Sequence, residues 1–215
     1  MSDLADRTRG RIFALIIACG CLAATEPAAA QDPAGQFSQS AATAINQALL
    51  FAQNDDFQKA LDVLDIAVAA RDLTPYETAT IYQMMGQYSY DLDELDTAQV
   101  AFETALLSGG LRPHEDRDIQ VVIAQLMIAR GNYSEGGERL KAIVKADDAP
   151  KIQYLELIAQ AGIQAQDYSR VLPWAELWFE SVEVKERRHY DLLIFLYSEL
   201  GMTEAKQKIS KERLD

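Results

Sequence analysis

The stretch YQMMGQYSYDLDELDTAQVAFETA, residues 82–105, decides the fold. Two segments without proline flank the polar turn Asp93-Glu94, and small residues recur in them at Gly86, Ala98 and Ala105. Small side chains at helical spacing let two helix axes approach to about 8–10 Å. The stretch therefore predicts a pair of antiparallel helices, with the small residue of the first helix facing a small residue of the second.

The same pattern recurs along the chain. Phe57, Leu95, Tyr133 and Tyr168 each follow a short polar turn, with spacings of 38, 38 and 35 residues. Nine residues before these four positions stand Ala48, Gly86, Ala124 and Ala159. Three residues after them stand Ala60, Ala98, Gly136 and Val171. Seven and ten residues after them stand Leu64, Phe102, Leu140 and Ala175, and Ala67, Ala105, Ile143 and Trp178. A weaker fifth unit contains Leu193, Gly201, Ala205 and Ile209. One helix pair cannot bury its apolar stripe alone, so the units are expected to stack.

The run Tyr82…Met85-Gly86…Ala98…Phe102…Ala105 resembles the tetratricopeptide repeat (TPR) over about residues 41–215. The resemblance implies an all-α, right-handed α-solenoid of four to five helix-turn-helix repeats, and Pro75 and Pro113 stand where a helix pair should end. Gly136-Gly137 and Pro173 depart from the pattern, because glycine and proline disfavour helix interiors. The array is expected to be least regular between residues 133 and 180.

A narrower similarity links the chain to exported repeat proteins encoded with TonB-type energy-transduction components. It rests on Leu73-Thr74-Pro75-Tyr76-Glu77-Thr78-Ala79 and on Leu172-Pro173-Trp174-Ala175-Glu176. Thr74-Pro75 also has a local explanation, because threonine caps helices and proline suits their first position.

The TPR resemblance implies a concave, partner-binding face formed by the first helix of each repeat. Its register places there the amide, tyrosine and arginine side chains of Gln83, Gln87, Tyr90, Gln125, Gln160, Gln164, Arg187, Tyr190 and Tyr197. Glutamine carries both a donor and an acceptor, so such a ladder can pair with the main chain of an extended peptide. The alternative is that glutamine occupies exposed helix faces simply because it is a fair helix former.

The charge narrows the class of partner. The 215 residues contain 33 acidic and 20 basic side chains, a net charge of −13. That sign argues against binding to nucleic acid or to anionic membranes and favours neutral or basic protein segments. Arg187 is the only cation of the predicted face, so a basic clamp for peptide carboxylates is not expected.

The N-terminus has the order of an export signal. Arg7, Arg9 and Arg11 precede the uncharged residues 12–24, and Ala28 and Ala30 suit cleavage after residue 30. Residues 1–30 are predicted to be a signal peptide, 31–40 a flexible leader and 41–215 the repeat domain, so the mature chain is expected in the periplasm without a membrane span. The alternative is lipid attachment at Cys19, which follows an imperfect acylation box, Ile16-Ile17-Ala18. The chain is then an outer-membrane-tethered lipoprotein that serves outer-membrane assembly or the cell-wall machinery.

The side chains that catalysis and metal binding require are sparse. His114 lacks the second histidine of a zinc helix, and His189, beside Arg187 and Arg188, is expected to be structural. The acidic run 91–96 lacks the spacing of a calcium loop. No cofactor, metal or enzymatic activity is predicted. The expected function is that of a scaffold or adaptor for envelope proteins.

Overall fold

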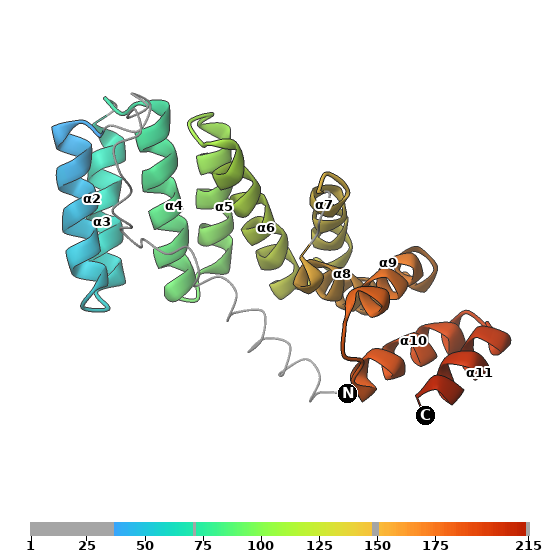
Figure 1. Ribbon diagram of the computed structural model, residues 1–215. Helices are drawn as coiled ribbons and strands as arrows, with labels where there is room; N and C mark the ends of the chain where they lie inside the picture. Colours follow the sequence, from blue (N-terminus) through green and yellow to red (C-terminus); the bar gives the residue numbers. More distant parts are fainter. Residues whose placement is uncertain (1–36, 71, 148–150, 214–215) are drawn as a thin grey trace. The chain divides into compact units, whose positions relative to one another are not determined.

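The computed structural model describes residues 37–70, 72–147 and 151–213, and in those ranges the chain forms α-helices and no strands (Figure 1). The helices are α2 (Gln39–Ala52), α3 (Phe57–Ala69), α4 (Pro75–Asp91), α5 (Leu95–Leu107), α6 (Pro113–Ala129), α7 (Tyr133–Lys145), α8 (Ile152–Gln164), α9 (Tyr168–Ser181), α10 (Arg187–Glu199) and α11 (Thr203–Glu212). The predicted all-α class is confirmed. The predicted signal peptide and Cys19 lie outside the described residues, and α2 begins at Gln39, two residues before the predicted start of the repeat domain.

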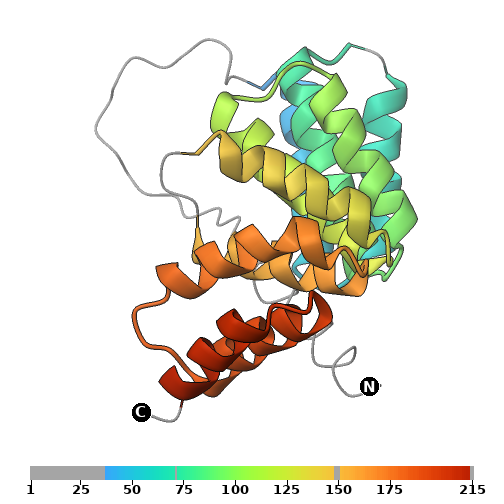
Figure 2. The same ribbon diagram turned by 90° about the vertical axis from the view of Figure 1, so that its right-hand side faces the viewer.

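The contacts divide the chain into two compact units, which meet in sequence between Leu126 and Met127. In the first unit α3 packs against α2 and α4, and α4 packs against α5. In the second unit α8 packs against α7 and α9, and α10 packs against α9 and α11; Figure 2 shows this last pair side by side. Helices thus contact their sequence neighbours, as stacked helix pairs do.

The second helix of each pair begins at the residue that the sequence repeat aligns. Helices α3, α5, α7 and α9 start at Phe57, Leu95, Tyr133 and Tyr168, and α11 continues the series at Thr203. Two residues earlier the backbone is left-handed in every repeat, with φ of 59° at Asp55, 63° at Asp93, 88° at Gly131, 58° at Gln166 and 66° at Gly201. The next residue donates its N–H to the carbonyl five residues back, at 2.8–3.0 Å, from Asp56, Glu94, Asn132, Asp167 and Met202. Each first helix therefore ends in a Schellman motif.

We expect Gln166→Gly to stabilise the protein by about 0.5–1 kcal/mol, because a left-handed backbone strains any side chain with a Cβ. Gly201→Ala should cost about 1 kcal/mol, since no atom lies within 4 Å of an added methyl group and only the backbone is strained. Urea unfolding measures both. Gln166→Ala is the control and should leave the unfolding free energy nearly unchanged. A destabilised Gln166→Gly would contradict the explanation.

The repeat positions nine residues before and three residues after the start of each second helix lie in the core. At these positions, Ala48, Ala60, Ala98, Ala124, Ala159 and Val171 are fully buried. The nearest neighbour of Gly86 is a large residue, although the sequence predicts that small residues face one another. A methyl group added there would lie 2.9 Å from three carbons of the Phe102 ring. The missing side chain at Gly86 therefore leaves room for the ring of Phe102. At Gly162, an added methyl group would likewise lie 2.4 Å from Cγ2 of Val171. This exchange of volume brings α4 close to α5 and α8 close to α9.

We expect Gly86→Ala to destabilise the protein by about 1–2 kcal/mol, because overpacking against the ring exceeds the gain in helix propensity. Gly137→Ala is the matched control. Its methyl group would meet only the Cβ of Ala161, at the ordinary distance of 3.6 Å, so it should stabilise α7 by up to about 1 kcal/mol. Thermal unfolding of the two variants tests the contrast, and two changes of the same sign would refute it.

The glycines and the proline that depart from the repeat pattern do not break their helices. Helix α7 runs from Tyr133 to Lys145 through Gly136 and Gly137, and α9 runs from Tyr168 to Ser181 through Pro173. Proline lacks the N–H that would bond the carbonyl of Ser169. The predicted bend at Pro173 stays a prediction.

A buried carboxylate joins the start of α2 to the start of α4. Glu77 is fully buried and accepts the backbone N–H of Ser38 at 2.5 Å and that of Thr74 at 2.7 Å. Thr74 Oγ1 accepts the N–H of Glu77 in return, which completes a capping box. Burial raises the pKa of Glu77, but the hydrogen bonds from Thr74 and Ser38 outweigh it and lower the pKa from 4.5 to about 2. The charged carboxylate therefore stabilises the fold.

A folded pKa below the unfolded value adds stability that is present above pH 4.5 and is lost as the pH falls toward 2. We expect Glu77→Gln to lower the unfolding free energy at pH 7 by roughly 3 kcal/mol, the equivalent of that shift. The difference between wild type and variant should shrink between pH 4.5 and pH 2. Urea titrations across this range measure it, and a difference independent of pH would show that the charge contributes nothing.

Candidate functional site

Helix α4 carries three of the four predicted face residues that lie in the first unit. Gln83, Gln87 and Tyr90 are partly exposed, and spacings of four and three residues place them on one side of the helix. Gln87 Nε2 donates to the carboxylate of Asp91 at 3.2 Å. Burial, followed by the charges of Asp91 and Asp93, raises the pKa of Tyr90 to about 12. This face thus presents amides and an un-ionised phenol.

Gln125, on α6, is not available for a partner. It is only 5% exposed, and every residue from Ile123 to Ile128 is buried. The register taken from the resemblance assumes that one side of each first helix stays open, whereas this half of α6 is covered. The prediction that Gln125 contacts a partner is therefore corrected.

In the second unit the predicted residues lie on α8 and α10. Gln164 is exposed, and Gln160 is partly exposed and donates to Glu156 at 3.2 Å. The side chain of Arg187 is 83% exposed, with Nε 3.3 Å from the carboxylate of Asp191. The partly exposed ring of Tyr190 meets Phe179 edge to face at 5.1 Å. These four side chains have accessible surface that a partner can contact.

Tyr197 has a structural position instead. The residue is 9% exposed, and its hydroxyl donates to Glu176 at 2.8 Å, which links α10 to α9. Burial, followed by the hydrogen bond to Glu176, raises its pKa to about 12. Its prediction as a partner-binding residue is corrected, because its polar atom is already committed within the unit.

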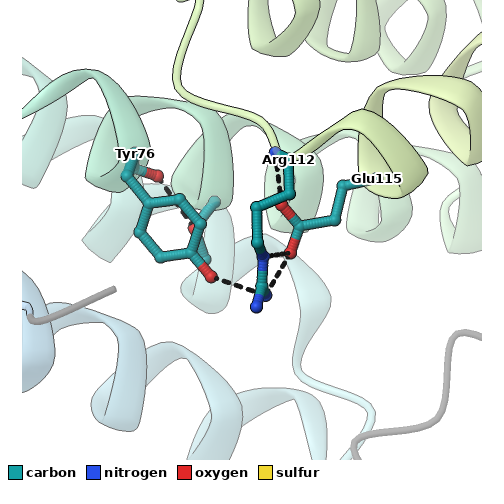
Figure 3. Close-up of polar contacts among 4 residues, drawn as sticks. Tyr76, Arg112 and Glu115 are labelled. Carbon is teal, nitrogen blue, oxygen red and sulfur yellow. Dashed lines mark hydrogen bonds and ion pairs between the residues drawn. The ribbon is translucent and has the colours of Figure 1, made fainter. Parts of the chain in front are cut away.

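A polar contact that the sequence reasoning missed joins the starts of α4 and α6 (Figure 3). Arg112 Nη2 donates to the Tyr76 hydroxyl at 3.2 Å, and the guanidinium carbon lies 5.7 Å from the Tyr76 ring centroid. The same guanidinium bonds Glu115 through Nε at 3.0 Å and Nη2 at 2.5 Å. The ring of Phe37 adds a contact to Tyr76 at 5.6 Å. One signal in the sequence could have found this contact. Tyr76 and Arg112 are 36 residues apart, close to the repeat length, as expected of residues at the starts of successive first helices.

The charge is distributed unevenly over the chain. Residues 37–126 contain 14 acidic and 4 basic side chains, whereas residues 127–215 contain 15 and 13. The first unit therefore carries most of the net negative charge. A surface of that sign attracts basic segments and repels acidic ones.

In the described ranges, no three histidine, cysteine, aspartate or glutamate residues are grouped so that they could hold a metal ion. The helices of these same ranges include none with the length and apolar character needed to cross a bilayer.

No family model matches the sequence. A search of curated proteins likewise returned no match. Solved structures do match. A tetratricopeptide repeat protein from Parabacteroides merdae has a TM-score of 0.61 at 18% identity, over 82% of this chain and 66% of that one. MamA from Desulfovibrio magneticus RS-1 has a TM-score of 0.60 at 14% identity, over 83% of this chain and 96% of that one. At such identities the likeness establishes the fold, which is that of tetratricopeptide-repeat proteins.

Proposed function

From the tetratricopeptide-repeat fold we propose that the chain is a non-catalytic scaffold that binds a segment of a partner protein along the first helices of its repeats. The observation that carries the proposal is the partly exposed set Gln83, Gln87 and Tyr90 on α4, within a unit of 14 acidic and 4 basic side chains. Amide groups pair with the N–H and C=O of an extended chain, and tyrosine adds contact area at little entropic cost.

The charge of the first unit selects the partner. A neutral or basic segment approaches it without repulsion, and lysine or arginine side chains gain from the surrounding carboxylates. Helix pairs that are already packed need no ordering on binding, so moderate affinity follows from few contacts.

We place this scaffold in the periplasm, bound to an envelope protein and linked to TonB-type transport. Support comes from the export signal in residues 1–30 and from the sequence similarity around Thr74-Pro75 and Pro173. The alternative, a lipoprotein tethered through Cys19 that serves outer-membrane assembly or the cell wall, is supported by Ile16-Ile17-Ala18-Cys19. The intact mass of the mature protein separates the two, because a chain that begins at Gln31 cannot be acylated at Cys19.

We expect the double variant Gln83→Ala with Gln87→Ala to recover its partner from envelope extract at least ~5-fold less well than wild type, because main-chain pairing along α4 is lost. Quantitative pull-down with mass spectrometry measures the recovery. The matched control is Gln58→Ala with Thr97→Ala, two exposed positions on the second helices α3 and α5. Equal recovery by both double variants would place the binding surface elsewhere.

A further inference from the structure

The second unit contains a cavity of about 400 Å³ where α8 and α10 begin and where residues 182–186 link α9 to α10. Its walls include Ile152, Glu156, Trp178, Val184, Arg188 and His189. None of these residues belongs to the predicted partner-binding set. A volume of this size lies in the range of small-ligand and side-chain pockets.

The cavity lies where the repeat loses a helical turn. The first helices α4 and α6 contain 17 residues each, whereas α8 and α10 contain 13. The second helices α7 and α9 keep 13 and 14 residues. Because α8 begins only at Ile152 and α10 at Arg187, the C-terminal end of α9 around Trp178 is left with a hollow beside it.

The walls of the cavity are held by polar contacts. Arg188 Nη1 bonds Glu156 at 2.9 Å, and its Nε bonds Glu186 at 3.0 Å, so one guanidinium joins α8 to the link. Lys185 Nζ donates to the carbonyl of Val182 at 2.7 Å and lies 5.2 Å from the Phe179 ring centroid. These contacts connect the starts of α8 and α10 to the link.

His189 carries a buried, unpaired donor inside the wall. It is 2% exposed, its ring lies 4.9 Å from the Trp178 ring, and its Nδ1 accepts the N–H of Glu186 at 2.7 Å. Burial, followed by the charge of Arg188, lowers its pKa, so the ring is neutral at neutral pH and its proton stands on Nε2. That Nε2 is itself buried and has no hydrogen-bond partner among the described residues, so it is a cost inside the wall and not a donor open to a ligand. The expected structural role of His189 accounts for one of its two nitrogens only.

The other lining residues indicate which kind of ligand the cavity can bind. The lining includes three carboxylates, Glu156, Glu183 and Glu186, and one cation, Arg188, with Lys185 beside it, so a small excess of negative charge remains. Apolar surface stands among them, since Ile152 is 43% and Val184 77% exposed. A ligand that suits both must be apolar at its centre and positively charged beside it.

We propose that this cavity anchors an aliphatic or aromatic side chain of a partner protein's extended segment, flanked by lysine or arginine. The site is separate from the α4 face. Its test is therefore independent of the proposed function, and either can fail without the other.

The probe is the peptide acetyl-Ala-Lys-Leu-Lys-Ala-amide, titrated into the full chain and followed by ¹H–¹⁵N NMR. We expect saturable shifts at the Trp178 indole and at residues 182–186. Replacing both lysines by glutamate, or the leucine by serine, should weaken binding at least ~10-fold, the size of effect that a lost apolar or charged contact produces. The absence of saturable shifts up to about 5 mM, a regime of negligible affinity, would overturn the proposal, as would equal shifts with all three peptides.

A charge variant tests the contribution of the carboxylates. Glu183→Lys, at an exposed position, should narrow or reverse the preference for basic flanks. Leu107→Ser, which changes a side chain 86% exposed in the first unit, is the control and should bind as wild type. Unchanged binding and unchanged peptide preference in Glu183→Lys would refute the assignment, provided that its amide spectrum shows folded protein.

Discussion

The close approach of the two helices within each pair is the constraint on which the rest of the structure depends. At Gly86 the absent side chain admits the ring of Phe102, and at Gly162 it admits Val171. Because one member of each contact contributes almost no volume, the axes come near enough for the second helix to bury its apolar stripe. The left-handed residues before the second helices, such as Asp93 and Gly131, then return the chain in the same conformation each time.

Much of this architecture was predictable from the sequence, because it is local and repeated. The starts of α3, α5, α7 and α9 follow from aligning one residue per repeat, and the small residues mark buried positions. Burial of individual polar side chains was less predictable. Gln125 and Tyr197 occupy open positions in the family register, yet α6 is covered on that side and Tyr197 bonds Glu176. A periodic pattern indicates which way a side chain points and not what lies opposite.

The cavity in the second unit is another feature that the repeat pattern does not predict. Apart from Trp178, its lining residues occupy none of the aligned repeat positions, and the hollow accompanies the shortening of α8 and α10 rather than a motif. The two units also differ in charge, one strongly acidic and one nearly balanced. They therefore present different chemistry: amides and phenol on the acidic unit, and an apolar pocket with local carboxylates on the balanced one.

The shortened first helices also limit how many residues of a bound extended strand each helix can contact. Four fewer residues at 1.5 Å of rise remove about 6 Å of helix, whereas an extended chain advances about 3.3 Å per residue. A strand laid along α8 or α10 thus meets about two residues' worth less surface than one along α4. Selectivity in the second unit then rests less on main-chain length and more on the identity of a single inserted side chain.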